Sequence, residues 1–318
     1  MKKTLKNATE NQANTLNEYE DELNKYVSGT TQTQKLADKV KVGDYVTFTP
    51  DALDSNAVST LKANLNTYSG KSDSTINPEI KRDDLKWRVL DVQNGQVRLI
   101  SETPTTSKIE LYGYNGYNNA VKLIDDACST LYTNTKLANK VQNLKIEDIT
   151  KYMKTQPTEN TTPYSPEFKY YPEILLKEKG QTVNEKAGTE LDLSEQTEFI
   201  SQTTKPQVSS WTLKNTYWSQ SMYNTDSFTD SKYYELFINI GSNYPTYWMS
   251  SRCVDADSGI AYFRVRRVDS GYVDALYLYD SVGDELSYGY AFRPVITLNS
   301  NVQVTSGNGS PESSFNIQ

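Results

Sequence analysis

The stretch from Tyr244 to Leu298 constrains the fold more than any other part of the chain, because apolar residues recur in it at every second position. Over 262–266 the apolar residues Phe263 and Val265 alternate with Tyr262, Arg264 and Arg266, and the same alternation recurs over 272–276. The alternation predicts that Arg266 points away from the core. Side chains of a strand point alternately to its two faces. Ser270-Gly271 suits a turn. The pattern therefore predicts two half-buried strands with one face in the core and one face free to vary.

The composition of this stretch is unusual for the chain. Residues 244–293 contain eight of the 24 tyrosines and many Ser, Asp and Gly residues, but no Lys or Gln, and Glu285 is their single Glu. Binding loops have such a composition, because rigid aromatic anchors alternate in them with small polar groups. Strands also favour Tyr and Val over Lys and Glu. A binding surface and an ordinary strand-rich segment both remain open.

Charge and residue usage exclude several functions. The net charge of −7 and the pI of about 4.9 argue against nucleic acid and against an anionic membrane surface as partners. The absence of histidine excludes Ser-His-Asp and Cys-His catalysis and imidazole metal ligands. Cys128 and Cys253 form either two buried thiols or one long-range disulfide. The sequence contains no apolar run of about 18 residues, so we expect no membrane span or signal peptide in it.

The amino-terminal half shows several local patterns. Residues 1–30 predict a polar helix with one narrow apolar stripe, suited to a stalk. Residues 42–48 predict a strand, and the runs 85–92 and 96–100 predict a hairpin around Asn94-Gly95. The polar residues 52–84 between them predict a long loop.

The later patterns complete the expected organisation. Residues 119–154 predict helix with two apolar faces, 155–208 an irregular insertion, and 232–240 a short helix or strand. The Ser/Asn/Gly-rich residues 301–318 predict a fraying tail. These elements predict an α+β domain over 40–300.

Several short strings resemble a bacterial C-type-lectin-fold domain of undefined function, from the branch that includes the formylglycine-generating enzymes. The resemblance spans about residues 40–300 and rests on Leu85–Leu90, Val97–Ser101, Gly113–Ala120, Asp125–Cys128 with Leu131-Tyr132, Leu144–Ile149, Tyr247–Val254 and Phe292–Val295. It implies a C-type-lectin-like fold. Members of the family often follow a pilin-like hydrophobic helix on the surface of Gram-positive bacteria, which implies an extracellular, cell-surface or virion location. The paired active-site cysteines of the sulfatase-activating relatives have no counterpart here, so that activity is not expected.

Residues 250–293 also resemble the variable region of proteins diversified by diversity-generating retroelements. In those proteins the adenines of a template are randomised, so that variable codons take the form NNY, with any base at the first two positions and a pyrimidine at the third. Such codons cannot encode Lys, Glu, Gln, Met or Trp, so Glu285 is expected to be a fixed position. The resemblance implies these variable, ligand-binding positions: Asp255, Asp257, Gly259, Ile260, Tyr262, Arg264, Arg267, Asp269, Tyr272, Asp274, Leu276, Tyr277, Asp280, Val282, Asp284, Leu286, Tyr288 and Gly289.

Other constellations give weaker indications. The aspartates of this stretch lack the spacing of an EF-hand, so solvated acids are favoured over a calcium site. The arginines 264, 266 and 267 either pair with these acids or grip an acidic partner. Trp211, Trp218 and Trp248 suit a core better than a sugar-stacking platform.

The sequence predicts a binding protein without cofactor or catalytic residues that recognises a protein or glycan on another cell or phage. Two further interpretations stay open. One is a surface hydrolase acting on glycans or peptides, which needs two convergent carboxylates in a cleft. The other is a pilin-like structural subunit built on residues 1–30.

Overall fold

The computed structural model describes residues 34–71, 80–155, 194–203, 223–239, 246–257, 260–280 and 282–318, together with Tyr19 and the short pairs 170–171 and 207–208. The helix predicted over 1–30 lies outside the described residues except for Tyr19, and so does most of the predicted insertion. No helix within the described ranges is long and apolar enough to cross a membrane.

The fold is α+β, as predicted. Its described strands form one large sheet, one small sheet and two separate strand pairs. The large sheet has the order β1-β14-β15-β2-β3-β4-β13-β6 and is antiparallel except for β15 beside β2. Its strands are β1 (Gln34–Lys35), β2 (Tyr45–Thr47), β3 (Trp87–Gln93), β4 (Gln96–Ser101), β6 (Ala138–Asn143), β13 (Pro294–Leu298), β14 (Gln303–Ser306) and β15 (Phe315–Ile317).

The small sheet is antiparallel and has the order β11-β10-β9. It consists of β9 (Tyr247–Asp257), β10 (Ile260–Asp269) and β11 (Tyr272–Asp280). Beside it, β12 (Ser287–Tyr290) pairs with β5 (Ile109–Tyr112), and a separate pair joins β7 (Tyr170–Tyr171) and β8 (Gln207–Val208). The helices are α2 (Ser55–Tyr68), α3 (Gly113–Tyr132), α4 (Ile146–Thr150) and α6 (Ser231–Phe237), with short 3-10 turns at Leu36–Asp38 and Thr225–Ser227.

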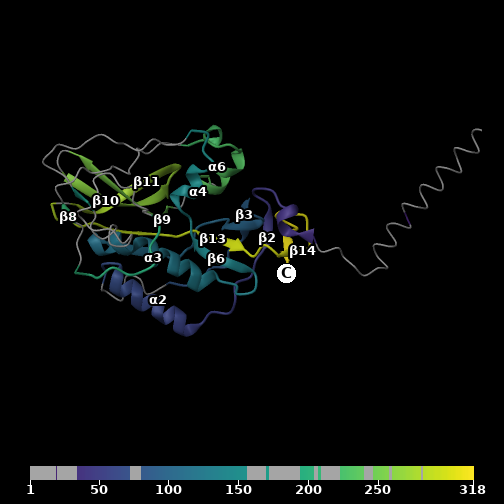
Figure 1. Ribbon diagram of the computed structural model, residues 1–318, viewed down its shortest axis with the longest axis horizontal. Coiled ribbons are helices and arrows are strands. Elements are labelled where there is room, and N and C mark those ends of the chain that lie inside the picture. Colours follow the sequence, from purple (N-terminus) through teal and green to yellow (C-terminus); the bar gives the residue numbers. More distant parts are fainter. Residues whose placement is uncertain are drawn as a thin grey trace, which may run out of the picture.

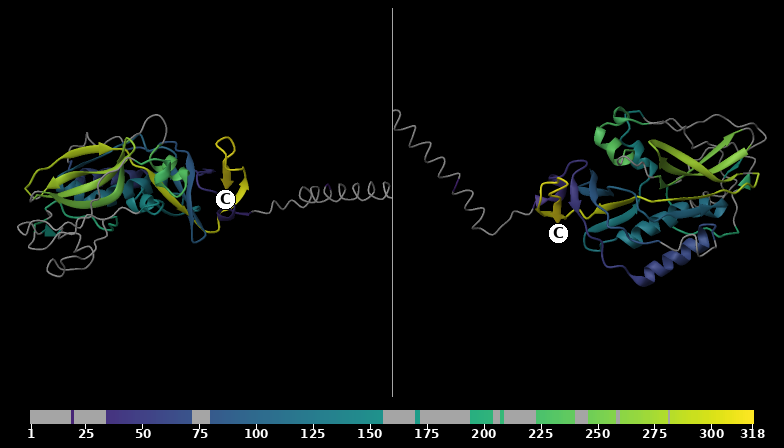
Figure 2. Two further views of the ribbon diagram at one scale, coloured as in Figure 1. Left: turned by 90° about the horizontal axis from the view of Figure 1, so that it is seen from above. Right: turned by 180° about the vertical axis from the view of Figure 1, so that it is seen from behind.

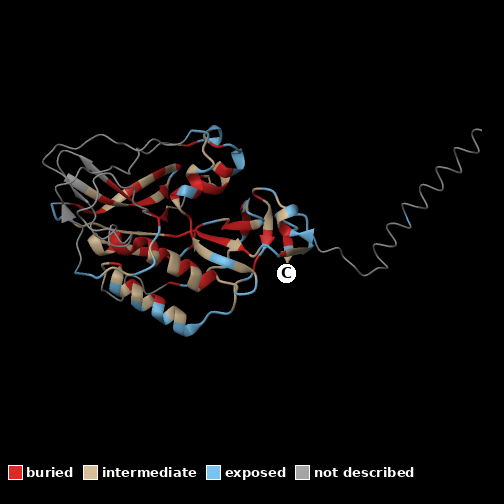
Figure 3. Cartoon of the chain, viewed as in Figure 1, coloured by how far each residue is buried: buried red, intermediate tan, exposed pale blue. Residues whose placement is uncertain are grey.

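Helix α3 lies at the centre of the domain. The small sheet covers one side of it and α2 covers the other (Figure 1). Its residues are buried over most of its length, whereas the outer side of α2 faces solvent (Figure 3). The strands β14 and β15 lie beside β2, at the opposite end of the molecule from β10 and β11 (Figure 2). The small sheet is therefore anchored on a rigid core through its helix-facing side.

The hairpin predicted around Asn94-Gly95 is confirmed as β3 and β4. Both turn residues have positive φ, 51° and 75°, as a two-residue hairpin turn of this type requires. The predicted turn at Ser270-Gly271 is confirmed in the same way, with φ of 46° and 91° between β10 and β11. Of the helix or strand predicted over 232–240, the structure shows the helix α6 at Ser231–Phe237.

Three predictions are wrong. The loop expected over 52–84 contains helix α2, whose first N–H groups bind the carboxylate of Asp54. The helix expected over 119–154 ends at Tyr132, and Val141 of its expected second face lies in the strand β6 against β13, while Ile149 lies in the short helix α4. The tail at 301–318 does not fray, because β14 and β15 extend the large sheet and bury Phe315.

Part of the predicted insertion is docked firmly on α3. The buried side chain of Asn119 accepts a hydrogen bond from the backbone N–H of Ile200 at 2.8 Å and donates one to its carbonyl at 3.2 Å. In addition, Phe199 stacks on Tyr68 with 4.2 Å between ring centroids. Asn119 thus pairs with this segment as a neighbouring strand would.

Replacing Asn119 with alanine is expected to lower the free energy of unfolding by about 1–3 kcal/mol, because buried backbone groups of the docked segment lose their partner. Urea unfolding measures this change. The matched control is Asn56→Ala on the exposed start of α2, for which we expect a change within about 0.5 kcal/mol. Equal effects of the two substitutions would contradict the role of Asn119.

Candidate binding face on the small sheet

The alternation predicted for β10 and β11 places the predicted variable residues away from the core. Phe263 and Val265 of β10 are buried, and so are Val273 and Ala275 of β11. Their neighbours Tyr262, Arg264, Tyr272, Asp274 and Leu276 are half-buried. Phe263 packs on Tyr117 of α3 with 5.2 Å between ring centroids. One face of the hairpin is therefore held by the helix.

Six residues of β10, β11 and β12 form a group of two contact clusters, which we call the tyrosine–arginine face. The group consists of Tyr262, Arg264, Arg267, Tyr277, Tyr288 and Tyr290, all half-buried. The guanidinium of Arg264 lies 5.1 Å from the ring centroid of Tyr262 and 5.8 Å from that of Tyr277. These two rings meet edge to face at 5.1 Å. Cation–π contacts and ring packing thus hold this part of the group together.

The second half of the face is built around Arg267. Its guanidinium donates a hydrogen bond of 2.7 Å to the hydroxyl of Tyr290 and lies 5.1 Å from the centroid of that ring. It also forms ion pairs with Asp269 at 2.9 Å and Asp274 at 3.1 Å. Arg267 therefore pairs with acids of the same sheet, which is one of the two alternatives left open by the sequence.

The core supports the face from behind. The ring of Tyr290 packs edge to face on Trp248, with centroids 4.7 Å apart, and also stacks beside Tyr288. Trp248 is fully buried, and its indole N–H donates to the carbonyl of Ile109 at 2.8 Å. Trp248 is therefore a core residue, as predicted, while Trp211 and Trp218 lie outside the described residues.

The pKa of Tyr288 reflects this close packing. Burial, followed by the neighbouring phenols of Tyr277 and Tyr290, raises its pKa above the ordinary value, although Arg264 and Arg267 act in the opposite direction. The phenol of Tyr288 therefore stays neutral at physiological pH. It is available there as a hydrogen-bond donor.

Two predicted orientations differ in the structure. Arg266 is buried instead of outward-facing, because it lies at an irregularity where the pairing of β10 with β9 shifts by two residues between Val265 and Arg267. Asp280, a predicted ligand-binding position, is also buried, with 3% of its surface exposed. Its carboxylate accepts hydrogen bonds from the backbone N–H groups of residues 282, 283 and 284. Asp280 therefore shapes a turn and does not face a ligand.

The remaining predicted positions surround the face. Val282 and Asp284 are exposed on the connection from β11 to β12, and Leu286 and Gly289 are half-buried. The strands place Asp257 beside Ile260. Nothing is described of the side chains at Asp255, Asp257 and Ile260, and Gly259 lies outside the described residues. Tyr290 is absent from the predicted positions. Its period-two spacing from Tyr288 is the signal that would have found it.

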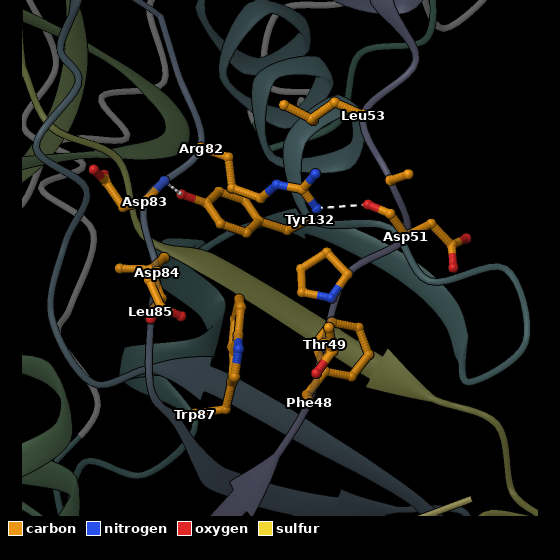
Figure 4. Close-up of a pocket in the computed structure, with 12 residues that line it drawn as sticks. Phe48, Thr49, Asp51, Leu53, Arg82, Asp83, Asp84, Leu85, Trp87 and Tyr132 are labelled. Carbon is orange, nitrogen blue, oxygen red and sulfur yellow. Dashed lines mark hydrogen bonds between the residues drawn. The ribbon is translucent and has the colours of Figure 1, made fainter.

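A cavity of about 480 Å³ lies elsewhere, between the residues that precede α2 and the end of α3 (Figure 4). Its rings pack edge to face, with centroids 5.5 Å apart for Phe48 and Trp87 and 5.7 Å apart for Trp87 and Tyr132. Trp87 and Tyr132 are buried, so neither ring offers a broad face for stacking a sugar.

Three charged side chains of this cavity are engaged within the protein, those of Asp51, Arg82 and Asp83. Arg82 donates to the carbonyl of Asp51 at 2.6 Å, and the carboxylate of Asp51 accepts two hydrogen bonds from Thr135. These bonds hold the pKa of Asp51 below its ordinary value. The carboxylate of Asp83 accepts two further bonds from Thr106. The cavity thus ties loops together, and we place the candidate functional site on the tyrosine–arginine face.

The two cysteines, both within the described part of the chain, are buried thiols and not a disulfide. Burial, followed by the charge of Asp125, raises the pKa of the Cys128 thiol well above its ordinary value, which disfavours the reactive thiolate. Among the described residues, no three Cys, Asp or Glu side chains gather in a way that could hold a metal ion. Comparison with known proteins adds no family, since no family model, no curated protein and no solved structure matches the chain.

Proposed function

We propose that this protein is a ligand-binding surface protein whose tyrosine–arginine face recognises a protein or glycan on another cell or phage. One observation carries the proposal. Five of the predicted positions, Tyr262, Arg264, Arg267, Tyr277 and Tyr288, belong to the two contact clusters of this face, on the side of the sheet that α3 leaves uncovered.

The chemistry of this group suits recognition. Tyr and Arg are the residues that contribute most to binding energy in protein interfaces, because they offer a large contact area together with hydrogen bonds. The ion pairs of Arg267 and the ring contacts of Arg264 hold these long side chains before a partner arrives. A surface that is ordered in advance loses less entropy on binding. The proposed face would therefore bind as a largely preformed surface.

We further propose a C-type-lectin-like fold and diversification of this face by a retroelement. The buried positions Phe263, Val265 and Val273 hold the sheet on the core, and substitutions at their outward neighbours leave those contacts in place. Glu285, which NNY codons cannot encode, lies between the exposed Asp284 and the half-buried Leu286. Asp280 is the exception, because its exchange would remove the acceptor of three backbone N–H groups.

Sequencing of the gene and its flanks in sister strains tests the proposal. We expect substitutions to cluster at the outward positions of β10, β11 and β12, to be restricted to residues that NNY codons encode, and to spare Phe263, Val265 and Glu285. A near-identical template copy and a reverse transcriptase gene should lie nearby. Sister strains that are identical at the outward positions, or that vary evenly along the chain, would overturn diversification.

A further inference from the structure

Residues 282–286, in the connection between β11 and β12, approach the start of helix α3. The backbone N–H of Gly113, the first residue of the helix, donates to the carbonyl of Leu286 at 3.1 Å. In turn, the N–H of Leu286 donates to the carbonyl of Leu278 at 2.9 Å. The connection is thus attached both to the helix and to β11.

The side chain of Glu285 occupies the space beside this helix end. Gly113 has a φ of 58°, and a Cβ added to it would lie 2.7 Å from Oε1 of Glu285. The phenol of Tyr112, the residue that precedes the helix, donates a hydrogen bond to the same carboxylate. Only a glycine at 113 allows the carboxylate to approach the backbone so closely.

The helix itself lacks a carboxylate at this end. The cap residue Tyr112 makes no side-chain capping bond, and no acidic residue occurs in the first turn of this 20-residue helix. The amino-terminal end of a helix carries a partial positive charge and N–H groups without intrahelical acceptors, so it favours a nearby anion. Glu285 supplies that anion from a strand connection 172 positions further along the chain.

We infer that Glu285 is a positioning residue of the proposed binding surface: its carboxylate, seated on the start of α3, fixes residues 282–286 of the connection and with them the exposed side chains of Val282 and Asp284. A second acid acts from the other end, since Asp280 binds the N–H groups of 282–284. The inference rests on the proposed function in one respect, that the connection belongs to a binding surface. The contact between Glu285 and α3 does not depend on any ligand.

Amide hydrogen exchange of Glu285→Gln tests the inference, with Asp284→Asn as the matched control. Both substitutions remove one charge, but Asp284 is exposed. For Glu285→Gln we expect exchange to rise at least about tenfold at residues 282–286 and at the first turn of α3, without change in β3 and β4, because a charge-assisted hydrogen bond is lost. The control should leave exchange unchanged.

A second readout separates positioning from general loosening. The hydrogen bond and charge of Glu285 raise the pKa of Tyr112 above its ordinary value of 10.0, so Glu285→Gln should lower that pKa in an NMR titration of labelled tyrosine, with Tyr112→Phe assigning the signal. Unchanged exchange at 282–286, exchange that rises evenly along the chain, or an unchanged Tyr112 pKa would overturn the inference. Since no ligand is used, these outcomes leave the proposed function untouched.

Discussion

Replacing Phe263 with alanine is expected to lower the free energy of unfolding by about 3–5 kcal/mol, whereas replacing its neighbour Tyr262 should lower it by no more than about 1.5 kcal/mol. Phe263 is fully buried between Tyr117 and Tyr279, so its removal leaves a cavity against α3. Tyr262 is half-buried, and its replacement removes contacts within the face, to Arg264 and Tyr277.

Denaturant unfolding of the two variants under identical conditions measures the difference. The pair is matched, because both residues are aromatic, adjacent in sequence and in the same strand. The proposed function needs this asymmetry, since a face that varies freely must contribute little to folding. Similar losses for both variants would contradict the separation of a fixed face from a variable one.

Replacing Arg98 with alanine is expected to lower the free energy of unfolding by about 3–5 kcal/mol at neutral pH, because two buried carboxylates lose their shared counter-charge. Arg98 pairs with Asp91 at 2.7 Å and with Asp148 of α4, and all three residues are buried. An exposed pair gives the matched control, since Lys232→Ala should cost about 0.5 kcal/mol or less by loss of its bond to Glu235.

The pH dependence of this effect has a definite sign. Burial raises the pKa of Asp91, but the hydrogen bonds and charge of Arg98 outweigh burial and hold the pKa below its ordinary value of 3.8. In the wild type this carboxylate therefore stabilises the fold above its unfolded pKa, and that contribution is lost as the pH falls through the lower folded pKa.

Without Arg98, burial is left as the largest influence on Asp91 and raises its pKa, so the variant should recover part of its loss as the pH falls from 7 toward 5. Urea unfolding of both proteins at several pH values within this window gives the comparison. A difference between wild type and variant that stays constant from pH 7 to pH 5 would show that the buried carboxylates do not control the effect.

Local patterns in the sequence predicted those parts of the fold whose cause is local. The turn at Asn94-Gly95 and the alternation around Phe263 both follow from the preferences of single residues and from strand geometry. Helix α2 also carried a local signal that the prediction missed. Asp54 stands at its start, and Leu61 and Leu65 are buried at helical spacing.

The failures concern segments whose structure depends on distant partners. The residues of β6 have spacings of three and four that resemble a helix, yet they pair with β13, about 155 positions away. The carboxyl-terminal residues are polar, and β15 becomes ordered only because it pairs with β2, which comes from the other end of the domain. Short segments of this kind take their structure from the partner strand, and propensity decides little there.

The sequence alone determined which side chains share a face over 262–265 of β10 and 272–276 of β11, because the direction of a side chain along a regular strand is a local property with a period of two. Only the tertiary structure decided which side of the small sheet is covered by α3 and which residue pairs are shifted by the bulge that buries Arg266. It also decided that Tyr290 joins the tyrosine–arginine face from β12. It also placed Glu285 on Gly113. These features depend on packing between segments that are far apart in the chain, and no pattern within one segment contains that information.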